Sequence, residues 1–454
     1  MKLHVFRLTA LTLGTLMLSA FSVQAGILDI KEVKSPGGLT AWLVEDHTIP
    51  VISLRFAFKN SGSAYDPVEK QGLARLLSNT MDEGAGDLDS RAFQEKLTDL
   101  SISLGFSTSR DQFSGAVKTL TVNKAEAFRL LGLALTQPRF EAEAIERMRE
   151  ANLSRIKSDL SDPQWIAARI MNDAVFKDHP YMMNSGGTLT TLTKITAADL
   201  KAKVKNDLTR DRLIVSAAGD ITAEELSLLL DQIFGTLPES GTVTPVSNVE
   251  PPATPSTILY SKPIPQTVIN MYLPGVPVKA PDFAAAEVMN FIFGGAGFGS
   301  HLMEIIREKR GLTYGIYSGL SNLDHASILS ISSSSKNASA VELVNLTREE
   351  MANFVQTPVT AQELHDAKTY LVGSVPLDLT STDSISAYML SFQSEGLSKT
   401  YLDEREAAIK AVTAEDVAAV AKKTLTPDRM TVVLVGNPEH ATPTQTVTVL
   451  PNAE

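Results

Sequence analysis

The stretch Ile195–Leu200, which reads ITAADL, returns later in the chain as Val412–Val417, which reads VTAEDV. The likeness continues without a gap at a constant offset of 217 residues. It pairs LTRDR at Leu208–Arg212 with LTPDR at Leu425–Arg429, and the apolar run Leu213–Gly219 with Met430–Gly436. In each copy a threonine is placed to cap a helix, and a β-branched strand then ends at glycine. The chain therefore contains two copies of one unit of roughly 210 residues.

Local patterns within the first copy indicate strands and helices in alternating blocks. Strands are predicted at 39–45, 51–59, 102–107 and 112–120, and helices at 72–81, 90–100, 124–135, 141–159 and 165–176. This order favours an α+β fold of two homologous lobes, each a mainly antiparallel sheet covered by helices. The predicted domains are 26–238 and 256–440, joined by a linker at 239–255 that is rich in Pro, Ser and Thr, with a tail at 441–454.

The N-terminus has the features of a secretory signal peptide. Lys2 and Arg7 precede an apolar run from Leu8 to Phe21, and Val23–Ala25 then supplies small residues where signal peptidase cuts. The apolar run is shorter than the ~20 residues that a helix needs to cross a bilayer, which favours a cleaved signal at 1–25 over a retained anchor. We expect a periplasmic protein that has no membrane contact after cleavage.

Composition excludes several kinds of function. The net charge is −11 and no cluster of lysine and arginine forms a basic face, so nucleic-acid binding is not expected. The chain has no cysteine, which excludes disulfides, thiolate zinc sites and cysteine nucleophiles. The 43% share of hydrophobic residues and the 20% share of charged residues are those of a folded globular protein.

The common catalytic signatures are absent from the sequence. It contains no G-x-S-x-G elbow, no phosphate-binding loop and no local pair of zinc-binding histidines, because none of its seven histidines lies within five residues of another. The glycine run Gly294–Gly299 lacks the spacing of a dinucleotide loop and is interpreted as a flexible turn. His179 has no second histidine near it in sequence and is interpreted as a structural residue of the His-Pro-Tyr turn.

One short helix carries a resemblance to a known family. Gly72–Asn79 reads GLARLLSN and resembles the G-x-A-H-x-x-E-H helix of the insulinase (pitrilysin-type) zinc peptidases. In that helix two histidines bind zinc and the glutamate activates water. The three places hold Arg75, Ser78 and Asn79, and the family's third ligand, a glutamate about 76 residues further on, falls by count on Arg155. The resemblance implies that this chain has lost the base and every ligand and holds no zinc of its own.

A second motif resembles the part of the family that holds substrate. Residues 307–314 read REKRGLTY, similar to the arginine/tyrosine pair, seven residues apart, that binds the peptide above zinc supplied by the other half of the molecule. Arg307 and Tyr314 match this pair. A guanidinium donates to a carbonyl or carboxylate, and a phenol can donate to the oxyanion that forms as water attacks. The alternative from the residues alone is a solvated helix end followed by a core aromatic.

The resemblance covers nearly the whole mature chain and implies a particular role. In the family's short bacterial two-chain type, one chain keeps the zinc helix and the other keeps the arginine/tyrosine pair. This sequence has the second pattern. We therefore expect a non-metal subunit of a heterodimeric zinc peptidase that degrades peptides, with zinc in a homologous partner chain. A scaffold or peptide-binding homologue without proteolysis remains the alternative. A stand-alone hydrolase is disfavoured because no pair of nucleophile and base is visible.

Overall fold

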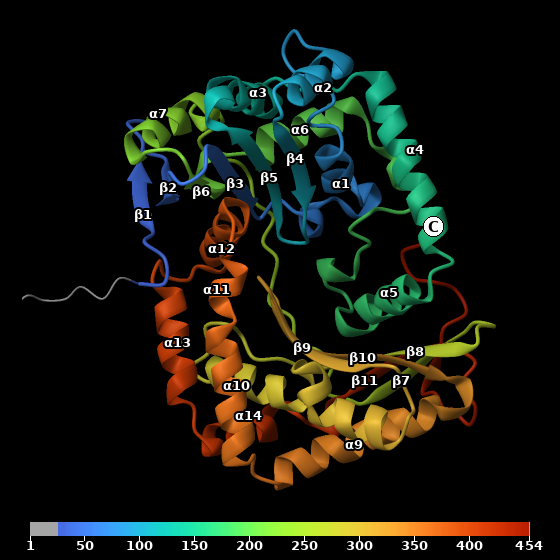
Figure 1. Ribbon diagram of the computed structural model, residues 1–454. Coiled ribbons are helices and arrows are strands. Elements are labelled where there is room, and N and C mark those ends of the chain that lie inside the picture. The colour runs from blue at the N-terminus through green and yellow to red at the C-terminus, as the bar shows by residue number, and fades with distance from the viewer. Residues whose placement is uncertain (1–25, 454) are drawn as a thin grey trace, which may run out of the picture.

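The computed structural model describes residues 26–453, so the predicted signal peptide at 1–25 lies outside the described residues. Two lobes follow one another along the chain, each built on a six-stranded sheet (Figure 1). The first lobe contains β1 (Lys31–Lys34), β2 (Thr40–Glu45), β3 (Val51–Lys59), α1 (Leu73–Ser78), α2 (Ser90–Asp99), β4 (Ser103–Thr108), β5 (Gln112–Leu120), α3 (Lys124–Thr136), α4 (Ala142–Asp159), α5 (Pro163–Val175), α6 (Ala197–Asp207), β6 (Leu213–Gly219) and α7 (Ala223–Phe234).

The second lobe repeats this plan. It contains β7 (Ser256–Ser261), β8 (Gln266–Pro274), α8 (Phe283–Asn290), η7 (Phe291–Gly295), η8 (Gly297–Gly299), η9 (Met303–Lys309), β9 (Ile316–Leu323), β10 (Ala326–Lys336), α9 (Ala340–Gln356), α10 (Ala361–Gly373), α11 (Val375–Asp378), α12 (Thr382–Glu395), α13 (Tyr401–Ala411), α14 (Ala414–Thr424), β11 (Thr431–Gly436) and β12 (Gln445–Thr446). The tail predicted at 441–454 thus adds β12 to the edge of the second sheet.

The two sheets have matching strand orders, β1-β2-β6-β3-β5-β4 and β12-β7-β11-β8-β10-β9. Most neighbours are antiparallel, but β2 pairs with β6, and β7 with β11 and β12, in parallel. The repeated apolar runs form β6 and β11, which lie inside their sheets between two neighbours. The α+β fold in two lobes is therefore confirmed, with each sheet mixed rather than purely antiparallel.

The internal repeat is also visible in the helices that precede these two strands. Thr196 caps α6 and Thr413 caps α14, and in each helix an aspartate three residues on bonds back to the cap. This reciprocal pair satisfies two backbone donors that a helix start would otherwise leave free. The predicted helix at 72–81 is shorter than expected, because α1 ends at Ser78.

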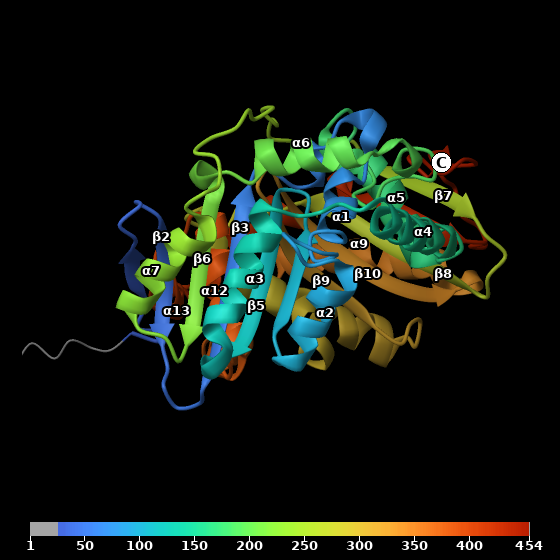
Figure 2. The same ribbon diagram turned by 90° about the horizontal axis from the view of Figure 1, so that it is seen from above.

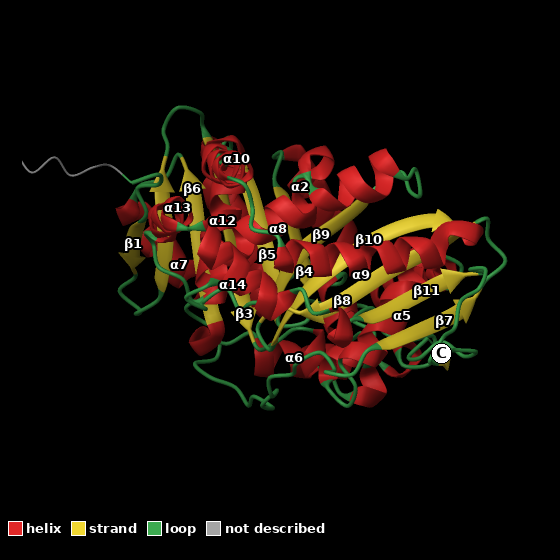
Figure 3. Ribbon diagram, turned by 90° about the horizontal axis from the view of Figure 1, so that it is seen from below, coloured by secondary structure: helices red, strands yellow, loops and turns green. Residues whose placement is uncertain are grey.

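Each sheet has one face covered by helices of its own lobe. Apolar side chains of α3 and α7 join those of β3 and β5 in the core of the first lobe, and Figure 2 shows these helices lying over the strands. In the second lobe α8, α9 and α14 cover the sheet in the same way, as Figure 3 shows from below. Burial of these apolar faces is the main favourable contribution to the free energy of folding of both lobes.

The other face of each sheet is covered by a helix from the opposite lobe. Helix α5 packs on β8 and β11 of the second sheet, where Ile166 and Ile170 are buried against Val433. Helix α12 packs on β3 and β6 of the first sheet through Ile385 and Met389 (Figure 1). The two lobes are therefore joined by an exchange of helices as well as by the linker. No helix among residues 26–453 is both long and apolar enough to cross a membrane.

Candidate functional site

The start of helix α1 is held in place by buried contacts. Gly72 precedes the helix with a φ of 90°, and a Cβ atom there would lie 2.7 Å from the Cα of Gly187, so only glycine fits. The backbone amide of Ala74 donates to both carboxylate oxygens of Asp66, each at 3.1 Å. Asp66 is buried and also lies 3.2 Å from the ammonium of Lys203 on α6. The backbone that would carry a metal-binding helix is thus firmly positioned.

The residues predicted at the metal positions lie together, on α1 and on the facing helix α4. Asn79 directly follows α1 and donates from its side-chain amide to Asn152 Oδ1 at 3.0 Å. Ser78 turns its hydroxyl back to the carbonyl of Arg75, at 2.8 Å. Burial, and then the charge of Arg155 on α4, hold the pKa of Arg75 below its usual range.

Asn152 is a residue of this group that sequence reasoning missed. It lies on α4 one helical turn before Arg155, and it is the α4 residue that bonds Asn79. Counting residues from Asn79 pointed to Arg155, which is exposed, whereas Asn152 is 3% exposed. A polar side chain on the buried face of an otherwise amphipathic helix was the signal that could have found it.

These residues do not fit a zinc ion. The group offers two guanidiniums, a hydroxyl and two amides, and it lacks the imidazoles and carboxylates that bind zinc in proteins. Among residues 26–453 no group of three or more His, Asp or Glu side chains is arranged to hold a metal. A divalent cation beside Arg75 and Arg155 would also be repelled by both of them.

Arg307 and Tyr314 project from a fixed backbone in the second lobe. Helix η9 has the wide turns of a π-helix, and from it the Arg307 guanidinium lies 4.2 Å above the ring of Phe298. Phe298 belongs to the glycine run predicted as a flexible turn, which forms η7 and η8. Tyr314 is 86% exposed, so it is not a core aromatic. The turn beside it is fixed by Thr313, whose hydroxyl donates to the carbonyl of Ser334 at 2.7 Å.

His301, at the start of the segment that leads to Arg307, bonds two glutamates. Its Nδ1 lies 3.0 Å from Glu350 on α9, and its Nε2 lies 2.7 Å from Glu363 on α10. The bond to Glu350 is the main reason that the pKa of His301 is raised, and Glu363 adds to it. With a proton on both nitrogens the ring can donate to both carboxylates, which ties η9 to two neighbouring helices.

His179 lies at the junction of the lobes and has a different set of partners. Its Nδ1 accepts from the backbone amide of Tyr181 at 3.1 Å, and its Nε2 donates to the carbonyl of Ser247 in the linker at 2.8 Å. Burial lowers the pKa of this imidazole, which favours the neutral ring that these two bonds require. Both ring nitrogens therefore bond the backbone.

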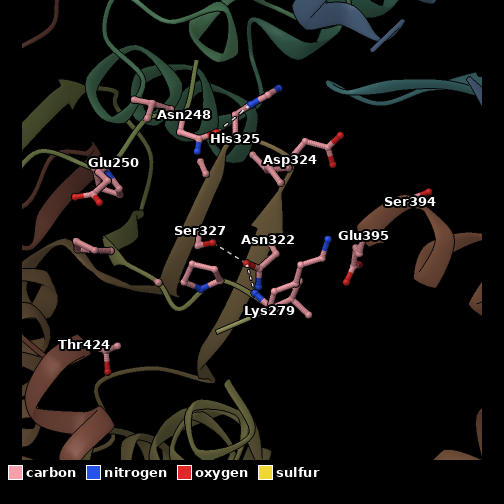
Figure 4. A pocket seen from close by; sticks show the side chains of 18 of the residues that line it. Asn248, Glu250, Lys279, Asn322, Asp324, His325, Ser327, Ser394, Glu395 and Thr424 are labelled. Atoms are coloured by element: carbon pink, nitrogen blue, oxygen red, sulfur yellow. Dashed lines mark hydrogen bonds between the residues drawn. The ribbon is translucent and has the colours of Figure 1, made fainter. Parts of the chain in front are cut away.

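A cavity of about 740 Å³ lies where the end of β8, the β9–β10 hairpin, the linker and α12 meet. Figure 4 shows its polar lining, in which Asn322 accepts from Ser327 at 2.6 Å and His325 bonds Asn248 at 3.2 Å. Neither Arg75 nor Arg307 lines this cavity. The two predicted sites and the cavity are thus three separate places in the chain.

Comparison with known families gives a match in each lobe. Residues 45–187 match the model described as insulinase (peptidase family M16), and residues 194–371 match the model described as peptidase M16 inactive domain. The first range contains α1 and α4, and the second contains Arg307 and Tyr314. The resemblance identified from the two motifs therefore extends over both lobes.

Individual relatives support the same relationship. The chain is 29% identical over 370 residues to a Helicobacter pylori protein named non-peptidase homolog YmxG, covering 80% of this chain and 84% of that protein. It is 25% identical over 398 residues to the probable mitochondrial-processing peptidase subunit beta of Schizosaccharomyces pombe, covering 84% and 85%. A crystal structure of a peptidase M16 inactive domain from Pseudomonas fluorescens matches with a TM-score of 0.84 at 26% identity, over 91% of this chain and 99% of that one.

Proposed function

Because this chain belongs to the insulinase family of peptidases, family M16, we propose that it is the subunit without metal in a two-chain zinc peptidase of the periplasm. The positions predicted for its metal ligands hold Arg75, Asn79 and Arg155, and the proteins it resembles include a non-peptidase homologue and an M16 inactive domain. The chain is accordingly catalytically inactive. In the proposed assembly the zinc and its water belong to a homologous partner.

The observation that carries the proposal is the display of Arg307 and Tyr314. Both side chains leave a backbone fixed by hydrogen bonds, and the Tyr314 ring is almost fully exposed. Within this chain no hydrogen bond to the Tyr314 hydroxyl is present among the described residues. A half-buried arginine held against Phe298 and an exposed tyrosine on the adjoining turn are suited to contact a second molecule.

The two side chains would bind and orient the peptide. The Arg307 guanidinium would donate to a backbone carbonyl of the peptide, which fixes the chain's direction across the partner's metal. The Tyr314 hydroxyl would donate to the oxygen on which negative charge develops when water attacks the scissile carbonyl. A relative named as the subunit beta of a processing peptidase supports the expectation of a partner chain.

Substitution of this pair tests the proposal. In the reconstituted complex, Tyr314→Phe and Arg307→Ala should each lower kcat/KM for a short fluorogenic peptide by about a hundredfold, the usual effect of removing one donor to an oxyanion. Tyr317→Phe and Arg310→Ala, which change exposed residues of the same type nearby, should leave it unchanged. Complex mass and zinc content are measured in parallel.

Unchanged turnover in both Tyr314→Phe and Arg307→Ala, in a correctly assembled complex, would overturn the role of the pair. That result would leave the chain as a scaffold or peptide-binding homologue.

A further inference from the structure

Arg75 on α1 and Arg155 on α4 each lie about one helical turn from the hydrogen-bonded pair Asn79 and Asn152, where the family's zinc helix meets α4. Burial is the main reason that the pKa of Arg75 is lowered, and the nearby charge of Arg155 lowers it further. A guanidinium does not lose its proton in a protein, so both side chains stay positively charged. Within residues 26–453 neither has a carboxylate oxygen within 4.0 Å. The half-buried Arg75 and the exposed Arg155 are therefore left without a carboxylate partner among these residues.

The same place contains hydrogen-bond donors that have no acceptor. Among the described residues, the buried Nδ2 of Asn152 has no hydrogen-bond acceptor, and the Nε of Arg75, like the Nε of five other arginines, has none either. Asn152 as a whole is 97% covered, and its oxygen is already used by Asn79. Buried polar groups in folded proteins are nearly always paired, so an unpaired group indicates a missing partner. What is missing here is an acceptor.

The backbone at Gly186 leaves room for the guanidinium of Arg155. A Cβ atom placed on Gly186 would lie 2.9 Å from the Nη2 of Arg155, so a larger residue at 186 would displace the guanidinium. The tight contact between Gly72 and Gly187 holds this loop against the start of α1. Arg155 is thereby positioned beside Arg75 by the packing of the glycine loop rather than by an ion pair.

From these contacts we propose that the position of the family's zinc has become an oxyanion-binding site in this chain. A carboxylate or phosphate oxygen between Arg75 and Arg155 would neutralise both charges and accept from the planar donors of a guanidinium fork. Asn152 Nδ2 supplies one further donor to the same anion. Two sources share this chemistry, namely the carboxylate of a peptide and a free phosphate. The site is independent of the role proposed for Arg307 and Tyr314.

Thermal unfolding of the mature chain, residues 26–454, tests the site without any partner. Sodium phosphate is exchanged for sodium chloride at constant ionic strength and pH, so that general screening stays the same. The Tm of the wild type should rise with the logarithm of phosphate concentration once this exceeds Kd, since a ligand that binds only the folded state stabilises it. Arg75→Gln/Arg155→Gln should lose this rise.

A matched control removes the same charge elsewhere. Arg91→Gln/Arg129→Gln replaces two arginines that have glutamate partners, and it should keep the full response to phosphate. The single variant Arg155→Gln changes an exposed side chain, so its response can be measured even if Arg75→Gln fails to fold. Equal responses of the wild type and of Arg155→Gln, or no response of the wild type beyond that to chloride, would overturn the proposal.

Two peptides then identify the source of the anion. A short acetylated peptide with a free C-terminal carboxylate and the same peptide as a C-terminal amide are titrated against phosphate-bound protein, with the phosphorus NMR linewidth as the readout. Displacement by the free carboxylate alone assigns the site to peptide carboxylates. Displacement by neither peptide assigns it to phosphate. Equal displacement by both would mean that no oxyanion is recognised, and would contradict the proposal.

Discussion

The individual side chains proposed to act in function differ in whether they could be found from the sequence. Arg307 and Tyr314 could be matched to the family's pair from sequence because they lie seven residues apart in one continuous stretch. The platform that Phe298 provides for Arg307 could not, since it depends on how a glycine-rich turn folds back over η9. Asn152 was missed for a related reason, because a residue count along α4 does not say which side chain meets α1. Cation–π contacts at exposed sites typically contribute about 0.5 to 1 kcal/mol, enough to favour one orientation of the guanidinium.

His301 gives a prediction about pH at this scale. Its folded-state pKa is raised mainly by Glu350, so the charged imidazolium favours folding. That contribution is fully present below the unfolded pKa of about 6.5 and is lost as pH rises through the higher folded value. The Tm difference between the wild type and His301→Gln should therefore shrink as pH rises from about 5 to about 9, a range that includes the unfolded histidine pKa of about 6.5. Substitution of the exposed His365 by Gln is the control. A difference that stays constant over this range would show that the charge is not the stabilising feature.

Among the elements, the repeat predicted the helix and the strand that each copy contains but not which helix covers which sheet. Strand β6 and helix α6, and their copies β11 and α14, follow from apolar periodicity and capping residues that can be read locally. The positions of α5 and α12 depend on long-range packing. The apolar faces of these helices show that each is buried, but not that the burying sheet belongs to the other lobe.

The exchange of α5 and α12 predicts that the lobes stay together without the linker. A protease site inserted between Thr244 and Pro245, both exposed, should be cut in the folded protein. The two fragments should then elute together in size-exclusion chromatography, because each lobe buries apolar residues of the other. Met389→Asp, which places a charge in the contact of α12 with the first sheet, should make the cut fragments separate more readily. Separation of the fragments of the otherwise unchanged protein would show that the exchanged helices do not hold the lobes together.

The protein as a whole keeps the family's fold, but the group of residues on α1 and α4 of its first lobe carries positive charge. The start of α1 is fixed by Asp66, Gly72 and Gly187, and the residues predicted at the metal positions supply hydrogen-bond donors and positive charge. In the proposed function, Arg307 and Tyr314 of the second lobe hold the peptide, and a second chain supplies the zinc that activates water.

Metal content and partner identity test that requirement most directly. The tagged mature chain is purified from its native host in two ways, once with its co-purifying proteins and once alone, after salt has dissociated them. Each sample is measured by native mass spectrometry and by elemental analysis. The account predicts no stoichiometric zinc and no peptide cleavage for the chain alone, and a co-purifying insulinase-family chain that carries the zinc. One equivalent of tightly bound zinc in the isolated chain, lost on chelation together with a proteolytic activity, would contradict it.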